Sequence, residues 1–529
     1  MVCVRKLTGN ILCKYYKNIG RCCIIISERS NTLLREEYDM LKDFVKPVKP
    51  EKEELKAQVK AARKQLFGYQ MKIKEAKLPV MVIFEGWGAA GKGSVLGKVI
   101  RNIDPRFFKT KKMDAPTAEE KRYPFLYRYL LEIPEAGKFT FYDTYWMEEV
   151  TNGVFNGDLD EEAYKQRIKS INTMERSLHD NGYLVLKFFF NISKKEQRRR
   201  LDALSANKNT RWRVNKDDRL ENKNYNEFRE IYDAYLEDTN RSVAPWYIID
   251  AEDSKWAELQ VLQFINQGID TALKNHSLAV PILQNTFPLL PIPKLADVSM
   301  EDKVLTDEEY DKELKELQEE LKKLHNKVYR KKIPVIIAYE GWDAAGKGGN
   351  IKRITAALDP RGFEVQPIAS PEPHEKARHF MWRFWNRLPK DGHIGIFDRT
   401  WYGRVMVERL EGFCSENDWQ RAYNEINEFE KELADWGAVV IKFWVHIDSD
   451  TQLARFTDRQ NNPEKQWKIT EEDWRNREKW DQYEEAVDDM LKKTNTEFAP
   501  WHILESNDKK YARIKALRIV VDAIKDACK

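Results

Sequence analysis

The sequence EGWDAAGKGG, residues 340–349, follows the apolar run IPVIIAY and precedes residues with a helical pattern. Its spacing G-x-x-x-x-G-K runs from Gly341 to Lys347. In such a loop, backbone N–H groups point into one concavity, the following helix N-terminus adds positive potential, and the lysine adds a point charge. A glycine-rich turn with a purely structural role is the alternative. We predict a phosphate-binding loop formed by Gly341, Ala344, Ala345, Gly346, Lys347 and Gly348.

The chain contains this loop twice. EGWGAAGKGS occupies residues 85–94, so the second copy lies 255 residues downstream. The same offset relates Ala244-Pro245-Trp246 to Ala499-Pro500-Trp501. A repeat of this length is too long for a solenoid, so each copy should have its own core. We therefore predict domains at 51–275 and 301–529, a proline-rich linker at 276–300, and a poorly ordered leader at 1–50.

Each copy alternates strand and helix patterns. A charged periodic helix is expected at 51–77 and again at 306–332, followed in each copy by a buried strand and the glycine-rich loop. Further strands are expected at Phe139–Asp143 and Ile394–Asp398. Alternation of this kind predicts an α/β fold, with two tandem parallel sheets that carry helices on both faces. Ligands of such sheets lie at the carboxyl ends of the strands.

Composition excludes several classes of protein. The 529 residues include 90 Lys and Arg against 86 Asp and Glu, a near balance that does not indicate nucleic acid as a partner. There is no apolar run long enough to predict a membrane span. Six cysteines in a chain of this length do not make a disulfide framework. We expect a cytoplasmic protein. The sequence leaves its oligomeric state open, with a homo-oligomer as one option.

The loop lacks the hydroxyl that usually helps to bind Mg²⁺, because Gly348 follows Lys347 where Ser or Thr is usual. Mg²⁺ prefers carboxylate oxygens, and the sequence has two carboxylates that the predicted sheet would bring close to the loop. Asp343 is inside the loop and Asp398 ends the strand IGIFD. We predict Mg²⁺ as the cofactor, held by these two residues. The alternative role is helix capping for Asp343, and turn formation at the strand end or helix capping for Asp398. The adjacent Arg399 could reach transferring phosphoryl oxygens or form a structural ion pair.

A basic segment at 451–480 is a candidate lid over a phosphate chain. Its cations are interleaved with acids, so a solvated helix face is the alternative. The predicted phosphate-binding residues of this segment are Arg455, Arg459 and Lys468. Upstream, the candidates for contact with the phosphate acceptor are Arg378, Arg383 and Tyr402. For Arg383 a fold-holding ion pair with Glu375 is an equal alternative, and for Tyr402 the alternative is packing.

Several motifs together resemble the type 2 polyphosphate kinase family. They are EGWDAAGKGG, IFDRTWYGRV, VERLEGFC, the lid segment with WKIT, and APWHI, and the resemblance covers about residues 51–529. It implies a P-loop kinase fold with a helical lid, and transfer of phosphate from inorganic polyphosphate to AMP, giving ADP. It also implies functional roles for Asp343, Lys347, Asp398, Arg399, Arg455, Arg459 and Lys468.

The two copies differ at these positions. Gly88 stands in the first copy where the second has Asp343, and Thr144 stands where the second has Arg399. We therefore expect catalysis in the C-terminal copy and a non-catalytic N-terminal copy. Two other functions fit the residues: an ATP-dependent nucleoside monophosphate kinase, and a polyphosphate-binding scaffold without catalysis.

Overall fold

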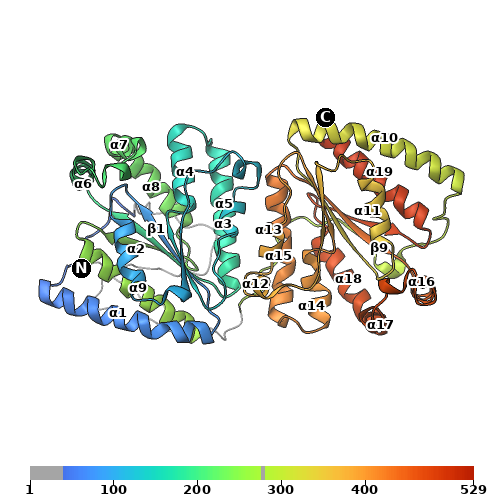
Figure 1. Ribbon diagram of the computed structural model, residues 1–529, viewed down its shortest axis with the longest axis horizontal. Coiled ribbons are helices and arrows are strands. Elements are labelled where there is room, and N and C mark those ends of the chain that lie inside the picture. The colour runs from blue at the N-terminus through green and yellow to red at the C-terminus, as the bar shows by residue number, and fades with distance from the viewer. Residues whose placement is uncertain (1–39, 276–279) are drawn as a thin grey trace, which may run out of the picture.

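The computed structural model describes residues 40–275 and 280–529, and Figure 1 shows two domains side by side. The elements of the N-terminal domain are α1 (Lys52–Glu75), β1 (Val80–Gly86), α2 (Lys92–Ile100), η1 (Pro105–Phe107), β2 (Phe108–Lys112), η2 (Glu120–Arg122), α3 (Tyr127–Leu130), β3 (Phe139–Asp143), α4 (Trp146–Asn156), α5 (Glu161–Asp180), β4 (Leu184–Asn191), α6 (Lys194–Ala206), η3 (Arg211–Arg213), α7 (Lys216–Lys223), α8 (Tyr225–Thr239), β5 (Trp246–Asp250) and α9 (Ser254–Asn275).

The C-terminal domain repeats this order after a short helical turn in the linker. Its elements are η4 (Leu295–Asp297), α10 (Asp307–Lys331), β6 (Val335–Gly341), α11 (Lys347–Thr355), β7 (Phe363–Pro367), α12 (Pro373–Lys376), α13 (Trp382–Trp385), β8 (Ile394–Asp398), η5 (Trp401–Val405), α14 (Val407–Leu410), α15 (Glu416–Asp435), β9 (Val439–His446), α16 (Ser449–Asn461), η6 (Gln466–Lys468), α17 (Glu471–Glu478), α18 (Trp480–Thr494), β10 (Trp501–Glu505) and α19 (Lys509–Ala527).

Each domain is built on a five-stranded parallel sheet. The strand orders are β2-β3-β1-β4-β5 and β7-β8-β6-β9-β10. The registers match as well, because Val80 pairs with Phe139 in one sheet and Val335 pairs with Ile394 in the other. Helices cover both faces of each sheet (Figure 1), so the predicted α/β fold is confirmed. The central strands β1 and β6 are buried along nearly their whole length, which explains their continuous apolar sequence.

The sheet topology positions the candidate site. The carboxyl ends of parallel strands lie at one edge, where the chain leaves β6 for the glycine-rich loop and leaves β8 after Asp398. Since β6 and β8 are hydrogen-bonded neighbours, the loop and Asp398 are brought to the same place.

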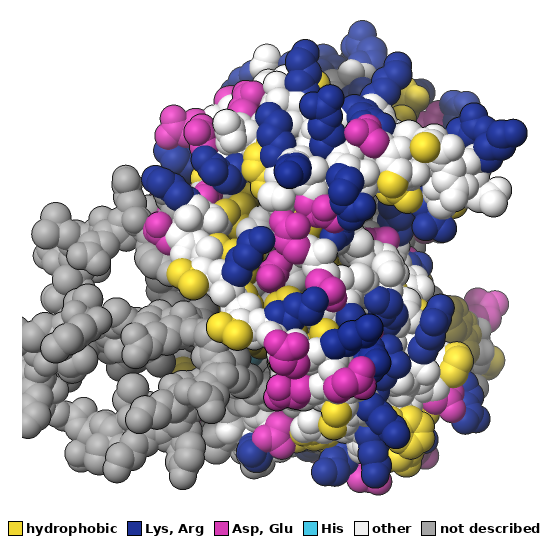
Figure 2. All heavy atoms as spheres, turned by 90° about the vertical axis from the view of Figure 1, so that its left-hand side faces the viewer, with side chains coloured by type: hydrophobic (Ala, Val, Ile, Leu, Met, Phe, Trp, Pro, Cys, Tyr) yellow, Lys and Arg dark blue, Asp and Glu magenta, His cyan; other side chains and the backbone are white. Residues whose placement is uncertain are grey.

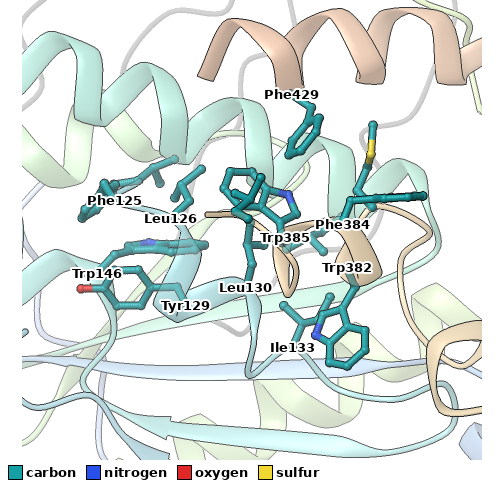
Figure 3. Packing of buried hydrophobic residues seen from close by; sticks show 14 of the residues in the cluster. Phe125, Leu126, Tyr129, Leu130, Ile133, Trp146, Trp382, Phe384, Trp385 and Phe429 are labelled. Carbon is teal, nitrogen blue, oxygen red and sulfur yellow. The ribbon is translucent and has the colours of Figure 1, made fainter. Parts of the chain in front are cut away.

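The domains face each other through equivalent elements. Helix α5 contacts α15, and α3 contacts α13, and each pair is related by the 255-residue offset. Figure 3 shows Leu130 and Ile133 of the first domain beside Trp382 and Trp385 of the second. Such a contact between equivalent faces has the geometry of a two-fold interface within one chain.

The segments outside the two domains were predicted as a leader and a linker. Residues 1–39 of the predicted leader, and 276–279 of the linker, lie outside the described residues. Further along, Leu41 is buried and its N–H donates to Asp233 of the N-terminal domain (2.6 Å). In the linker, Leu295 is buried and its N–H donates to Asp488 (2.8 Å). Among the described helices, none is both long enough and apolar enough to cross a lipid bilayer.

Candidate active site in the C-terminal domain

The loop between β6 and α11 has the backbone shape of an anion cradle. Gly341 has φ 152°, and a Cβ there would lie 2.5 Å from the carbonyl oxygen of Val445. Gly346 has φ 116° and caps α11, so its left-handed backbone also requires glycine. Lys347 begins α11, and its Nζ donates to the carbonyls of Gly341 (2.5 Å) and Trp342 (3.2 Å). The lysine charge therefore lies across the loop, beside the helix N-terminus.

Space for a ligand is present at the start of α11. A Cβ added at Gly348 would meet nothing within 4 Å. The missing hydroxyl noted in the sequence is thus not replaced by another side chain at this point. An approaching phosphate would find open space, helix N–H groups and Lys347 together.

Arg399 and Asp343 come together beside the loop. The Nη2 atom of Arg399 lies 3.7 Å from Oδ1 of Asp343, and the Arg399 side chain remains 54% exposed. Burial lowers the pKa of Arg399, but the carboxylates of Asp343 and Glu340, with smaller effects from other acids including Asp398, hold the pKa above its ordinary value. Arg399 has φ 65°, an unusual conformation for a residue other than glycine, and such strain is common at functional sites.

Asp343 is also joined to the lid. Its Oδ2 accepts a hydrogen bond from Nδ2 of Asn476 in α17 (3.1 Å), and its backbone carbonyl accepts one from Gln452 in α16 (3.2 Å). Tyr483 of α18 donates to Oδ1 of Asn476 (3.3 Å). Asp343 is therefore held by α16 through its backbone and by α17 through its carboxylate, and α18 supports the Asn476 side chain. Asn476 was missed in the sequence, where nothing distinguished it from other polar residues of a charged helix.

Glu340 is a second residue that the sequence reasoning missed. It is buried, and its Oε1 accepts hydrogen bonds from the backbone N–H (2.7 Å) and the hydroxyl (2.8 Å) of Thr400. Burial raises its pKa, and Lys347 opposes this rise. These bonds fix the turn that carries Arg399. The signal was present in the sequence, since both copies of the motif begin with Glu.

Arg455 supports the loop from behind. Its guanidinium donates to the carbonyls of Ala344 (2.9 Å), Ala345 (3.0 Å) and Ser506 (2.6 Å). Burial and the neighbouring Arg459 lower the pKa of Arg455 to about 10. The structure thus gives Arg455 loop carbonyls as partners, whereas the sequence predicted phosphate. Arg459 lies part-exposed one turn further along α16, and Lys468 ends η6.

The three acceptor candidates are placed elsewhere. Tyr402 is fully buried, donates to Glu430 (2.7 Å) and accepts from Lys442 (2.8 Å), so the structure corrects its prediction to a packing role. Arg378 lies at the domain interface and donates to Glu135 (2.9 Å). Arg383 is buried and donates to the carbonyl of Ala369 (2.7 Å), with its Nε 3.5 Å from Oε2 of Glu375. For Arg383 this geometry is that of the fold-holding alternative.

Comparison with known proteins places both domains in one family. The sequence model of the polyphosphate kinase 2 family matches the chain twice, at residues 49–277 and 304–529. The chain belongs to the polyphosphate kinase 2 family. The resemblance inferred from the motifs is thereby confirmed, and both domains are polyphosphate kinase 2 units.

The similar proteins include two that match over most of their own length. The polyphosphate:AMP phosphotransferase of Pseudomonas syringae pv. tomato is 39% identical over 459 residues, covering 86% of this chain and 91% of the relative. That of Pseudomonas aeruginosa is 38% identical over 474 residues, covering 88% and 95%. A crystal structure of a Pseudomonas aeruginosa protein assigned to polyphosphate kinase 2 superposes with a TM-score of 0.77 at 36% identity, covering 90% of this chain and 97% of that one.

The two polyphosphate kinase 2 units place a carboxylate at the loop in different ways. In the N-terminal unit, the N–H of Gly88 donates to Oε2 of Glu221 in α7 (2.8 Å). Glu221 is the counterpart of Asn476, as Gly88 is of Asp343. In the N-terminal unit the carboxylate therefore belongs to the lid helix rather than to the loop, and it accepts a hydrogen bond from a loop N–H. Thr144 stands in place of Arg399 and keeps the same backbone shape, with φ 67°.

Proposed function

We propose that the protein transfers the terminal phosphoryl group of inorganic polyphosphate to AMP, giving ADP, and that the C-terminal unit performs the reaction. Two relatives that share most of their length with this chain are named polyphosphate:AMP phosphotransferases. The single observation that carries the assignment to the C-terminal unit is the set formed by Asp343, Lys347 and Arg399 at one strand edge. The N-terminal unit keeps only the lysine of this set.

Phosphoryl transfer from polyphosphate to AMP requires that the anions be positioned, but it does not require a general base. The attacking group is a phosphate monoester oxygen of AMP, whose second pKa is about 6, so it is largely ionised at neutral pH. The difficulty is to hold two polyanions in line while charge is redistributed. Loop N–H groups and Lys347 can bind the donor chain, and the part-exposed Arg399 can reach the transferring oxygens.

We further propose that Asp343 and Asp398 bind Mg²⁺. The donors fit, since both are carboxylates and their segments meet at the end of neighbouring strands. Among the described residues, no cluster of three or more His, Cys, Asp or Glu forms a complete metal cage. Mg²⁺ commonly binds one or two carboxylates and takes its other oxygens from water and substrate phosphates. When bound, it would neutralise charge on the phosphate chain.

The N-terminal unit is proposed to be non-catalytic for a steric and electrostatic reason. A Cβ at Gly88 would lie 2.4 Å from Oδ1 of Asp218 and 2.9 Å from Oε2 of Glu221. An aspartate at this position would therefore require the side chains of Asp218 and Glu221 to shift, and it would repel both carboxylates. Glu148 adds another acid close to Lys92 and Asp143, which weakens the attraction for phosphate.

The matched variants Lys347→Ala and Lys92→Ala test this assignment. We expect Lys347→Ala to lower ADP formation from polyphosphate and AMP by roughly 100- to 1,000-fold, as for other electrostatic catalytic groups. Lys92→Ala should remain close to the wild type. Equal losses in both variants, or none for Lys347→Ala, would contradict the assignment.

The donor and acceptor can be tested in the same assay. ATP in place of polyphosphate should support little transfer, whereas equal rates with ATP would favour the nucleoside monophosphate kinase. Binding of polyphosphate without any ADP formation would favour the scaffold.

We also propose a cytoplasmic location, supported by the free thiols of Cys414 and Cys528.

A further inference from the structure

A broad groove lies on the N-terminal unit and shares no lining residue with the loop of either unit. It has a volume of about 740 Å³ and is formed by α1, the end of α2 with the following turn, and the start of α9. Its charged lining comprises six basic residues and one acidic residue, namely Lys56, Lys60, Arg63, Lys64, Arg101, Lys255 and Asp104. Figure 2, which faces this end of the molecule, shows Lys and Arg side chains over much of the surface.

Most of these cations have no acidic partner. Within the described part of the chain, Lys60, Lys64, Arg101 and Lys255 form no ion pair, whereas Arg63 is paired with the buried Glu258. Lys56 is paired only with the exposed Glu53, at 2.6 Å. Unpaired cations gathered in one groove repel each other, so a polyanion that entered it would relieve this repulsion.

The second unit provides an internal control for this charge. The 255-residue offset places three basic and three acidic residues at the positions equivalent to the whole groove lining, namely Lys315, Lys322, Lys510, Asp311, Glu319 and Asp359. In that unit Lys510 is also paired with Asp307. The shared fold therefore does not require a basic groove here. Only the N-terminal unit carries the excess of positive charge.

We propose that this groove is a second binding site for the donor, which holds a distal part of a long inorganic polyphosphate chain. The inference rests on the proposed function, because it takes polyphosphate as the donor. Figure 1 places α1 and α11 in different domains, so the groove and the C-terminal loop would bind different parts of one polymer. A chain held at two places returns to the catalytic loop more often than a free chain does.

The lining favours an inorganic polyanion over a nucleic acid. Single-stranded nucleic acids are bound by successive aromatic rings on which bases stack. Among the residues that line this groove, Phe67 is the one aromatic side chain, and it is 65% exposed at the surface. A row of lysines without a base-stacking surface suits a polymer that consists of phosphates alone.

The test removes three unpaired charges and compares long and short donors. In Lys60→Gln/Lys64→Gln/Arg101→Gln, we expect the KM for long-chain polyphosphate to rise on the order of tenfold and to lose part of its salt dependence, because fewer counterions are released. The kcat, and the KM for a short oligophosphate, should stay unchanged. The control Lys315→Gln/Lys322→Gln/Lys323→Gln removes three exposed charges from the equivalent helix α10 and should leave all parameters as in the wild type.

Direct binding of fluorescent long-chain polyphosphate, measured without AMP, separates this inference from the proposed function. Weaker binding by the groove variant than by the control supports the groove, even if no ADP is formed. Equal binding by both variants overturns it, even if phosphoryl transfer is normal. RNA of similar charge should compete poorly, and equal competition by RNA would also overturn the proposal.

Discussion

Glu340 shows how one buried acid can shape a site without touching substrate. It accepts two hydrogen bonds from Thr400, the residue after Arg399, and both donors are buried. In the N-terminal unit, Glu85 accepts from the N–H of Tyr145 (2.7 Å), and burial raises the pKa of Glu85 to about 8. A buried glutamate therefore holds the turn after the strand in both units, but only the turn of the C-terminal unit carries an arginine, Arg399.

The pair Glu340→Ala and Glu85→Ala should separate stability from catalysis. Loss of Glu340 leaves two buried donors without an acceptor, which costs about 1–3 kcal/mol for each. We expect a loss of roughly 2–6 kcal/mol in unfolding free energy, and reduced kcat because Arg399 is no longer fixed. Glu85→Ala should also destabilise its domain, yet keep kcat near the wild type. Denaturant unfolding and ADP formation measure the two effects.

Glu340→Gln keeps an acceptor oxygen, so it serves as a control for loss of activity that is caused by misfolding alone. It should unfold close to the wild type and retain much of the activity. Wild-type kcat in a folded Glu340→Ala protein would show that the turn does not depend on Glu340.

What the sequence can predict at this scale depends on how local the cause is. The shape of the loop follows from adjacent residues, so Gly341, Gly346 and Lys347 could be identified directly. The burial of Tyr402 depends on its contacts with Glu430 and Lys442, which come from other elements, and the sequence does not reveal it.

At the scale of elements, the loop and the lid are coupled by a stacked aromatic pair. The ring centroids of Trp342 in the loop and Trp480, the first residue of α18, lie 3.8 Å apart, and the angle between the ring planes is 10°. The N-terminal unit has Trp87 and Tyr225 at the equivalent positions, with ring centroids 3.9 Å apart and ring planes also at 10°. Since α17 ends at Glu478, two residues before Trp480, movement of the lid would disturb this stack.

The N-terminal unit suggests which substitution is tolerated. Trp480→Tyr should stack as Tyr225 does, and should change the unfolding free energy by less than about 1 kcal/mol. Trp480→Ala removes the stack and the apolar burial, at a cost of roughly 1–3 kcal/mol, and should raise the KM for polyphosphate. Thermal unfolding and steady-state kinetics on both variants test this. If Trp480→Ala matched Trp480→Tyr in both measurements, the stack would have no role in coupling.

The elements themselves were largely readable from the sequence. The strands expected at Phe139–Asp143 and Ile394–Asp398 coincide with β3 and β8, because buried parallel strands have continuous apolar runs. The pairing of α5 with α15 was not foreseen. These helices bury polar residues against each other, so their sequence resembles that of a solvated face.

At the scale of the whole molecule, the contact between the units is rich in buried charge. Arg176 of α5 is paired with Glu428 of α15, and Ser170 donates to Glu432 (2.5 Å). Burial raises the pKa of Glu425 to about 7, with Arg421 opposing the rise. Burial, aided by Arg404, Arg421 and Arg176, lowers the pKa of His379 to about 3. The interface should therefore respond to pH through two groups with opposite signs.

His379 gives a measurable prediction for the acidic range. It is buried against Ser177 of the other unit, with 3.1 Å between its Nε2 and the hydroxyl oxygen. Between pH 6.5 and about 3, the unfolded chain protonates this histidine while the folded chain keeps it neutral, so its contribution to stability falls as the pH falls. Glu425 acts oppositely, since its raised pKa favours the folded state below pH 4.5 and this contribution is lost as the pH rises through about 7.

His379→Gln keeps Glu425, whose Oε2 lies 3.9 Å from Nε2 of His379 and whose raised pKa of about 7 leaves it neutral in the folded protein at pH 5. Relative to the variant, the wild type should lose about 1.4 kcal/mol of unfolding free energy per pH unit below 6.5, or roughly 2 kcal/mol at pH 5. Denaturant unfolding at pH 7.5 and pH 5 measures the difference. The exposed His374→Gln control should follow the wild type. Parallel curves for the wild type and His379→Gln would mean that the folded protein protonates His379 freely, and that the units do not exclude water from it.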